Sequence, residues 1–150
     1  MFVSIVILGF SVLLFLYWFR YTCLLILSTK TAKDYTRQVA AANQLEFPAI
    51  RVHLQRAVPE SGMDSLQRSL EKDYQLLTGL LRHAAQFQVG GLSLEQRMLM
   101  VDYKAMKAWF ALARRFSKAA YAQQALQEMS DIVSHFANAM GERAAVGSRA

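Results

Sequence analysis

An apolar stretch opens the chain, and the residues after it place apolar and polar side chains at helical spacing. The eighteen residues 2–19 carry no charge and are rich in Phe, Leu, Ile and Val. A helix of that length measures about 27 Å, close to the roughly 30 Å of a bilayer core. The pattern predicts a transmembrane helix over residues 1–28. A cleaved secretory signal is the main alternative, but its basic start, shorter apolar core and small-residue cleavage site are not evident.

Residues that favour the membrane interface cluster near the end of the apolar run. They are Tyr17, Trp18, Arg20 and Tyr21. Aromatic and long basic side chains of this kind sit at headgroup level, so we interpret the cluster as an interfacial anchor. The helix stays apolar beyond this cluster, over residues 23–27. Either the span is longer and tilted, with Arg20 snorkelling to the interface at a cost of up to about 3 kcal/mol, or residues 23–27 pack against protein.

Basic residues follow the apolar run and do not precede it. By the positive-inside rule this asymmetry predicts an outside N-terminus and a cytoplasmic C-terminal domain. The residues concerned are Arg20, Lys30, Lys33 and Arg37.

Helix-forming residues continue beyond the apolar run and predict a juxtamembrane helical stalk over residues 29–58. Pro48 marks a break or a helix start, and Pro59 closes the segment. Residues 58–65 are predicted to form a loop. A second helix is predicted from Asp64 to Phe87, where apolar residues recur at steps of three and four.

Gly90 and Gly91 end that helix, and Ser93 with Gln96 predicts a capping box for the next one. From Leu94 to Met140 one alternating four-three register holds apolar residues at thirteen of fourteen positions. Such spacing predicts the seam of a bundle or coiled coil. The segment is one long helix or, as we favour, two helices bent near residues 115–118. The main seam positions are Met98, Val101, Leu112, Leu126, Met129, Val133 and Phe136.

These elements predict an all-α protein: a single transmembrane helix, a stalk, a small antiparallel bundle over residues 63–140 and a flexible tail over 141–150. The layout loosely resembles the LemA family, which also joins an N-terminal membrane helix to a helical bundle. The motifs characteristic of that family around its first soluble helix are missing here, so none of its properties is carried over.

The charge is basic overall, with a formal net charge of +6 and a single cysteine, Cys23. A basic balance fits an anionic membrane surface, an acidic protein or nucleic acid. One cysteine excludes an intramolecular disulfide and a CxxC pair. Cys23 is expected to be a plain buried thiol, with palmitoylation near the membrane as the alternative.

The sequence contains no motif of a known catalytic or cofactor site. His53, His83 and His135 are far apart and have no metal-ligand spacing. There is no GxSxG elbow, no GxxxxGK loop and no GxGxxG motif. We therefore expect a protein that is not an enzyme and that has no cofactor or metal.

A basic stripe lies along the first half of the 94–140 segment, with aromatic residues nearby in sequence. It is predicted either to contact an acidic or anionic partner or to be the solvated side of an amphipathic helix. Its members are Arg97, Lys104, Lys107, Arg114 and Lys118.

The sequence favours a non-catalytic, single-pass membrane protein whose helical domain mediates protein–protein interaction at the cytoplasmic membrane face. The expected partners are membrane lipid together with other membrane proteins or a second copy of the chain. The alternatives are an accessory subunit of a larger membrane complex and a module that binds anionic lipid or nucleic acid, of which nucleic acid is the less favoured.

Overall fold

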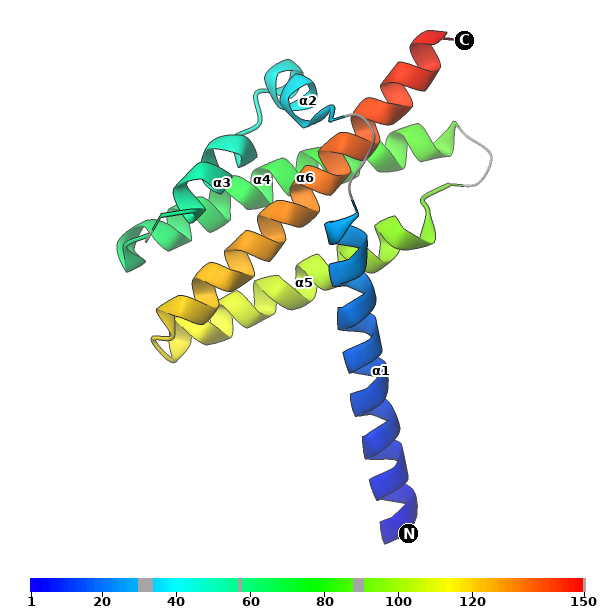
Figure 1. The fold of residues 1–150 in the computed structure, drawn as a ribbon, viewed down its shortest axis with the longest axis vertical. Coiled ribbons are helices and arrows are strands. Elements are labelled where there is room, and N and C mark those ends of the chain that lie inside the picture. The colour runs from blue at the N-terminus through cyan, green and yellow to red at the C-terminus, as the bar shows by residue number, and fades with distance from the viewer. Residues whose placement is uncertain (30–33, 57, 88–90, 150) are drawn as a thin grey trace. The chain divides into compact units, whose positions relative to one another are not determined.

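The computed structural model describes residues 1–29, 34–56, 58–87 and 91–149, and these residues form six α-helices and no strand. The predicted all-α fold is confirmed. The chain divides into two compact units, residues 1–30 and residues 31–150. Within the described residues the first unit is helix α1, and the second is a domain made of helices α2 to α6 (Figure 1).

Helix α1 spans Phe2–Ser28 and is long and apolar enough to cross a membrane. Its few polar groups bond within the helix: the hydroxyls of Ser11 and Thr22 donate to carbonyls four residues earlier, at 2.9 and 2.8 Å. Such bonds remove the cost of leaving a hydroxyl without a partner in an apolar medium. At Thr29 the backbone becomes extended, so the helix ends there.

The predicted stalk over residues 29–58 is not a continuation of α1 in the residues that the structure describes. Two short helices replace it, α2 over Thr36–Asn43 and α3 over Phe47–Leu54. The carboxylate of Asp34, just before the N-cap residue Tyr35, accepts a hydrogen bond from the Thr36 backbone N–H at 2.9 Å and so satisfies one donor of the first turn of α2. Bonds from the Thr36 hydroxyl and N–H lower the pKa of Asp34. Lys30, Lys33 and residue 57 lie outside the described residues.

Helix α4 spans Glu60–Gln86 and starts earlier than predicted. The expected loop over 58–65 is therefore wrong from Glu60 onward. Pro59 has extended backbone and directly precedes the first turn, where the missing N–H of a proline breaks no helical bond. Glu60 places a carboxylate in that first turn, which the helix dipole favours.

Helix α5 spans Leu94–Arg115, and the predicted capping box starts it. The Ser93 hydroxyl accepts from the Gln96 N–H, and the Gln96 side chain accepts from the Ser93 N–H, each at 3.2 Å. The helix ends at a turn in which Ser117 is left-handed, with φ 54°. Helix α6 then spans Ala119–Arg149, so the segment is two helices, as favoured from the sequence.

Helix α6 is the central helix of the domain and contacts each of α2, α3, α4 and α5. Figure 1 shows it running diagonally across α4 and α5, with α3 beside α4. Burial of its apolar side supplies the largest share of the core, because every other helix of the domain packs against it. Its fully buried side chains are Ala122, Leu126, Met129, Ile132, Val133, Phe136 and Ala137.

Residues 141–149, predicted to be a flexible tail, are the last turns of α6. Gly141 is buried against Tyr35, and a Cβ at position 141 would overlap that side chain. One turn earlier, the Asn138 side chain accepts a hydrogen bond from the Tyr35 backbone N–H at 2.8 Å. This end of α6 stays helical because the start of α2 packs against it, a contact with a residue 103 positions away.

Candidate interaction surface

The predicted seam lies in the core in α6 but not in α5. Leu126, Met129, Val133 and Phe136 are fully buried. On α5, by contrast, Met98 is half-buried, and the side chains of Val101 and Leu112 are 56% and 45% exposed. The left-handed turn at Ser117 is the reason, because it interrupts the register that the sequence carries from one helix into the next.

Helix α5 has two apolar sides, and only one of them enters the core. The core side carries Leu99, Met100, Tyr103 and Phe110. The opposite side carries apolar residues at steps of three, four and seven, which keeps them on one side of a helix. We call this exposed surface the α5 face: Leu94, Val101, Ala105, Ala108, Trp109, Leu112 and Phe116.

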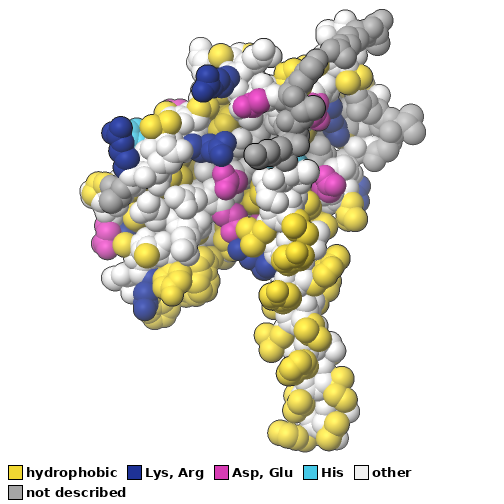
Figure 2. All heavy atoms as spheres, viewed as in Figure 1, with side chains coloured by type: hydrophobic (Ala, Val, Ile, Leu, Met, Phe, Trp, Pro, Cys, Tyr) yellow, Lys and Arg dark blue, Asp and Glu magenta, His cyan; other side chains and the backbone are white. Residues whose placement is uncertain are grey.

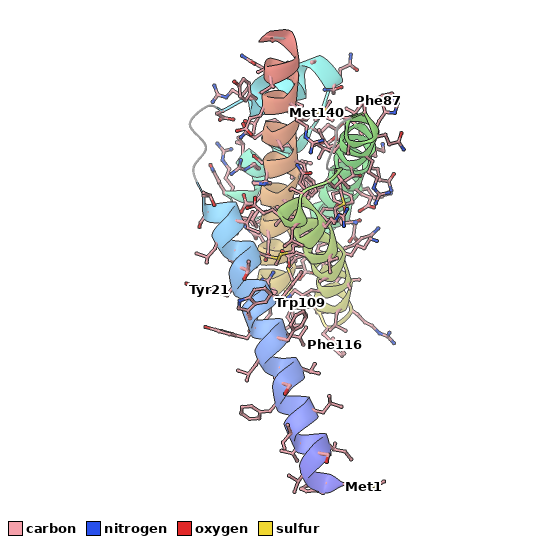
Figure 3. The ribbon with its side chains drawn as sticks, turned by 90° about the vertical axis from the view of Figure 1, so that its right-hand side faces the viewer. Met1, Tyr21, Phe87, Trp109, Phe116 and Met140 are labelled. Atoms are coloured by element: carbon pink, nitrogen blue, oxygen red, sulfur yellow. The ribbon has the colours of Figure 1, made fainter. Side chains whose placement is uncertain are left out.

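Aromatic side chains concentrate at the end of the α5 face that turns into α6. Trp109 and Tyr121 meet edge to face, with ring centroids 6.2 Å apart, and Phe116 is 65% exposed. Together with Leu112, Ala113 and Lys118 they line an open hollow of about 340 Å³. Figure 2 shows hydrophobic side chains gathered at this end of the domain, and Figure 3 labels Trp109 and Phe116. This end offers an apolar concave surface that the described domain leaves open.

The predicted basic stripe does not form one face. Lys107 and Arg114 point towards α4: the Lys107 ammonium lies 3.1 Å from Glu71, and the Arg114 guanidinium 3.2 Å from Asp64. Lys107 and Arg114 are seven residues apart and so lie on one side of α5. That side is rotated about the helix axis, by about one sixth of a turn or more, from the side that carries Arg97 and Lys104. Lys107 and Arg114 bridge α5 to α4, where each is paired with a carboxylate.

The remaining basic residues border the α5 face. Arg97, Lys104 and Lys118 are exposed, and so is Arg115, which is not a member of the predicted basic stripe. Arg97 and Lys104 are seven residues apart, and Arg115 follows Lys104 by eleven, which is three helical turns. The seven- and eleven-residue spacing beside an apolar row is the signal that would have found Arg115.

Polar and aromatic contacts join α4 to α5. The Tyr74 and Tyr103 rings stack with centroids 3.6 Å apart, and the Tyr103 hydroxyl donates to Glu71 at 3.0 Å. Burial and the neighbouring Glu71 carboxylate raise the pKa of the Tyr103 phenol, so it stays protonated and keeps donating. These contacts fix the rotation of α5 and hence which of its two apolar sides faces outward.

The predicted interfacial anchor lies in the second half of α1. Tyr17, Trp18 and Tyr21 have exposed side chains, and the Tyr17 and Tyr21 rings stack along the helix with centroids 6.5 Å apart. Arg20 lies between them in sequence, and Cys23 follows one turn later on the same helix. The aromatic members of the anchor are exposed, and their placement at a membrane interface stays a prediction.

The described residues hold no group of three or more His, Cys, Asp or Glu side chains that could bind a metal ion. Two of the histidines lie beside aromatic rings: His83 packs edge to face on Phe87, and His135 lies next to Phe136. Burial lowers the pKa of His135, although Glu95 and Glu142 act in the opposite direction. These side chains serve packing in the described structure.

No protein-family model, curated protein or solved structure matches this chain.

Proposed function

We propose that this chain is a non-catalytic, single-pass membrane protein whose helical domain binds a partner at the cytoplasmic membrane face through the α5 face. In this proposal α1 crosses the bilayer with its N-terminus outside. The length and apolar character of α1 support the span, and the basic residues that follow it support the orientation. The domain is then held next to the membrane by the chain itself.

The observation that carries the proposal is the exposed apolar row on α5. Soluble monomers seldom leave a contiguous apolar patch of several large side chains in water, and such patches mark interaction sites. Here Val101, Leu112 and Phe116 are about half exposed or more, on a helix whose other side already fills the core. The core of the domain does not use these exposed apolar side chains, because the other side of α5 already fills it.

A second candidate is an accessory subunit of a larger membrane complex. Leu24 and Leu25, near the end of α1, are about half exposed and extend the apolar surface past Arg20. Neighbouring transmembrane helices in a complex would cover them. Self-association through α1 has less support, because Gly9 has no second glycine four residues away.

Cysteine accessibility in native membranes tests the proposal. On a Cys23→Ser background, Leu112→Cys reports on the α5 face, and Leu76→Cys on α4 is the matched control, because the two leucines are 45% and 41% exposed. A membrane-impermeant maleimide is added to the cytoplasmic side of inverted vesicles. We expect Leu76→Cys to be labelled and Leu112→Cys to be protected until detergent dissolves the membrane.

Equal labelling of the two positions in the membrane would contradict the α5 face as the binding surface. Labelling of Leu76→Cys only from the opposite side would contradict the orientation.

A further inference from the structure

We infer that the partner of the α5 face is the anionic surface of the same membrane leaflet from which the chain emerges after α1. The inference rests on the proposed function, since it uses the same surface, and it names the partner. In the docked state α5 lies in the interface plane, with its apolar row in the headgroup region and its basic residues against lipid phosphates. Three features of the described residues support this occupant.

The first feature is the kind of apolar residue at the α5–α6 turn. Trp109, Phe116 and Tyr121 surround the open hollow there. Rings that combine an apolar body with a polar edge favour the headgroup boundary, as the Trp109 indole and the Tyr121 phenol do. A row of aliphatic side chains ending in such rings is typical of helices that lie on a membrane.

The second feature is the charge beside the apolar row. Arg97, Lys104, Arg115 and Lys118 are exposed along α5 and the turn that follows it. The acidic residues between Leu94 and Lys118 are Glu95 and Asp102, and Asp102 is buried. Within this segment the exposed charged side chains are mostly basic, and the carboxylates of Asp64 and Glu71 on α4 are paired with Arg114 and Lys107. This balance complements anionic lipid.

The third feature is the short connection to the span. Helix α1 ends at Ser28 and α2 begins at Thr36, so eight peptide units join them. Fully extended, that length reaches at most about 30 Å. The tether keeps the α5 face within reach of the leaflet and makes docking an intramolecular event at high effective concentration.

The size of the electrostatic contribution follows from the number of basic residues. Each Lys or Arg near an anionic surface raises the binding constant about fivefold. Removing Arg97 and Lys104 together should therefore lower the ratio of docked to undocked domain about 30-fold. Added salt should also lower the ratio of docked to undocked domain, because exposed charges are screened within about 10 Å at 0.1 M salt.

The two tryptophans of the chain allow a direct test in the full-length protein. Trp18→Phe leaves Trp109, on the α5 face, as the sole indole. The variant is reconstituted at one chain per nanodisc, in phosphatidylcholine alone or mixed with phosphatidylglycerol, with bromine on the acyl chains. We expect bromine to quench Trp109 in the anionic discs and far less in the neutral ones, with emission shifted to shorter wavelength.

The charge variants are made on the same background. Arg97→Gln with Lys104→Gln should abolish most of the quenching and the shift in anionic discs. Lys72→Gln with Arg82→Gln is the matched control, because it removes two exposed basic residues from α4, and it should change neither signal. Far-ultraviolet circular dichroism should be the same for all variants, since the four side chains are exposed.

The outcomes separate this inference from the proposed function. If Trp109 stays unquenched in anionic discs while Leu112→Cys is protected in native membranes, the lipid assignment is wrong and the occupant is a protein. Quenching that is equal in neutral and anionic discs overturns the role of the basic residues. Absence of both quenching and native protection rejects the α5 face as a binding surface.

Discussion

The carboxylate of Asp73 on α4 accepts a hydrogen bond from the backbone N–H of Phe47, the first residue of α3, at 2.7 Å. The same oxygen accepts from the N–H of Glu46 at 2.8 Å. A side chain of α4 thereby satisfies two backbone N–H groups at the start of α3, the helix that precedes it in the chain. Burial raises the pKa of the Asp73 carboxyl, and the two bonds from Phe47 and Glu46 act in the opposite direction.

Replacement of Asp73 tests this cap. Asp73→Ala should reduce the free energy of unfolding by about 1–3 kcal/mol, because it leaves two N–H groups at the buried start of α3 without an acceptor. Asp73→Asn keeps an acceptor and removes a desolvated charge, so it should lie much closer to the parent. Thermal melting of the detergent-solubilised chain measures both. Equal destabilisation by the two variants would show that the charge, and not the acceptor, holds α3.

Gly141 on α6 leaves room for the Tyr35 side chain at the start of α2. Gly141→Ala should lower stability by about 1–3 kcal/mol, because the new Cβ would overlap Tyr35 in a packed region. Gly79, inside α4, is the matched control, since a Cβ there meets nothing within 4 Å. Gly79→Ala should stabilise the domain by about 0.5–1 kcal/mol through its higher helix propensity. The two melting temperatures should move in opposite directions, and a joint rise would contradict the packing of Tyr35 on α6.

The two halves of the predicted seam should respond differently to truncation. Leu126→Ala, in the core on α6, should cost about 2–5 kcal/mol. Val101→Ala, on the α5 face, should stay within about 0.5 kcal/mol of the parent. Urea unfolding followed by circular dichroism gives both values. A large loss from Val101→Ala would mean that the α5 face is covered within the chain.

Acid should destabilise the domain through His135. Burial lowers its pKa below the ordinary 6.5, so the unfolded chain takes up a proton more readily than the folded one. The contribution of neutral His135 to the free energy of unfolding is fully present above about pH 6.5, the ordinary histidine pKa. It is lost as the pH falls through the lower pKa that His135 has in the folded domain. Glu95 and Glu142 act against this shift without reversing it.

His135→Gln should flatten that part of the pH dependence. Urea midpoints at about pH 7.5 and pH 5.5, on either side of the ordinary histidine pKa, give the comparison. His53→Gln is the control, because His53 lies outside the core. A pH slope that survives His135→Gln unchanged would assign the acid sensitivity to other groups.

The helices were predictable from local signals, and the way they pack was not. The uncharged run over residues 2–19 and the capping box at Ser93 and Gln96 are short-range patterns, and the structure contains both elements. Pro59 was assigned to a loop because a proline can end a helix as well as precede one. The choice depended on the first turn after it, where Glu60 favours a helix start.

The surface required information that lies far apart in sequence. Alanines at 105, 108, 119 and 122 let one register run through both α5 and α6, although only in α6 do its positions form the buried core, from Ala122 to Phe136. The rotation of α5 depends on the contacts of Tyr103 with Tyr74 and Glu71, about thirty residues away. Likewise the bond between Tyr35 and Asn138, which attaches the start of α2 to α6, joins segments 103 residues apart and leaves no local pattern in the sequence.

Because α6 is the central helix, the core of the domain can form only at the end of synthesis. Of the described helices it leaves the ribosome last, yet α2, α3, α4 and α5 all pack against it. Contacts of such long sequence separation form only after the chain between them exists. Under the proposed topology, α1 is therefore already in the bilayer while the four helices behind it still lack their common support. A ribosome that stalls before Ala119 would leave a membrane-bound fragment without a core, open to proteases that recognise unfolded chains.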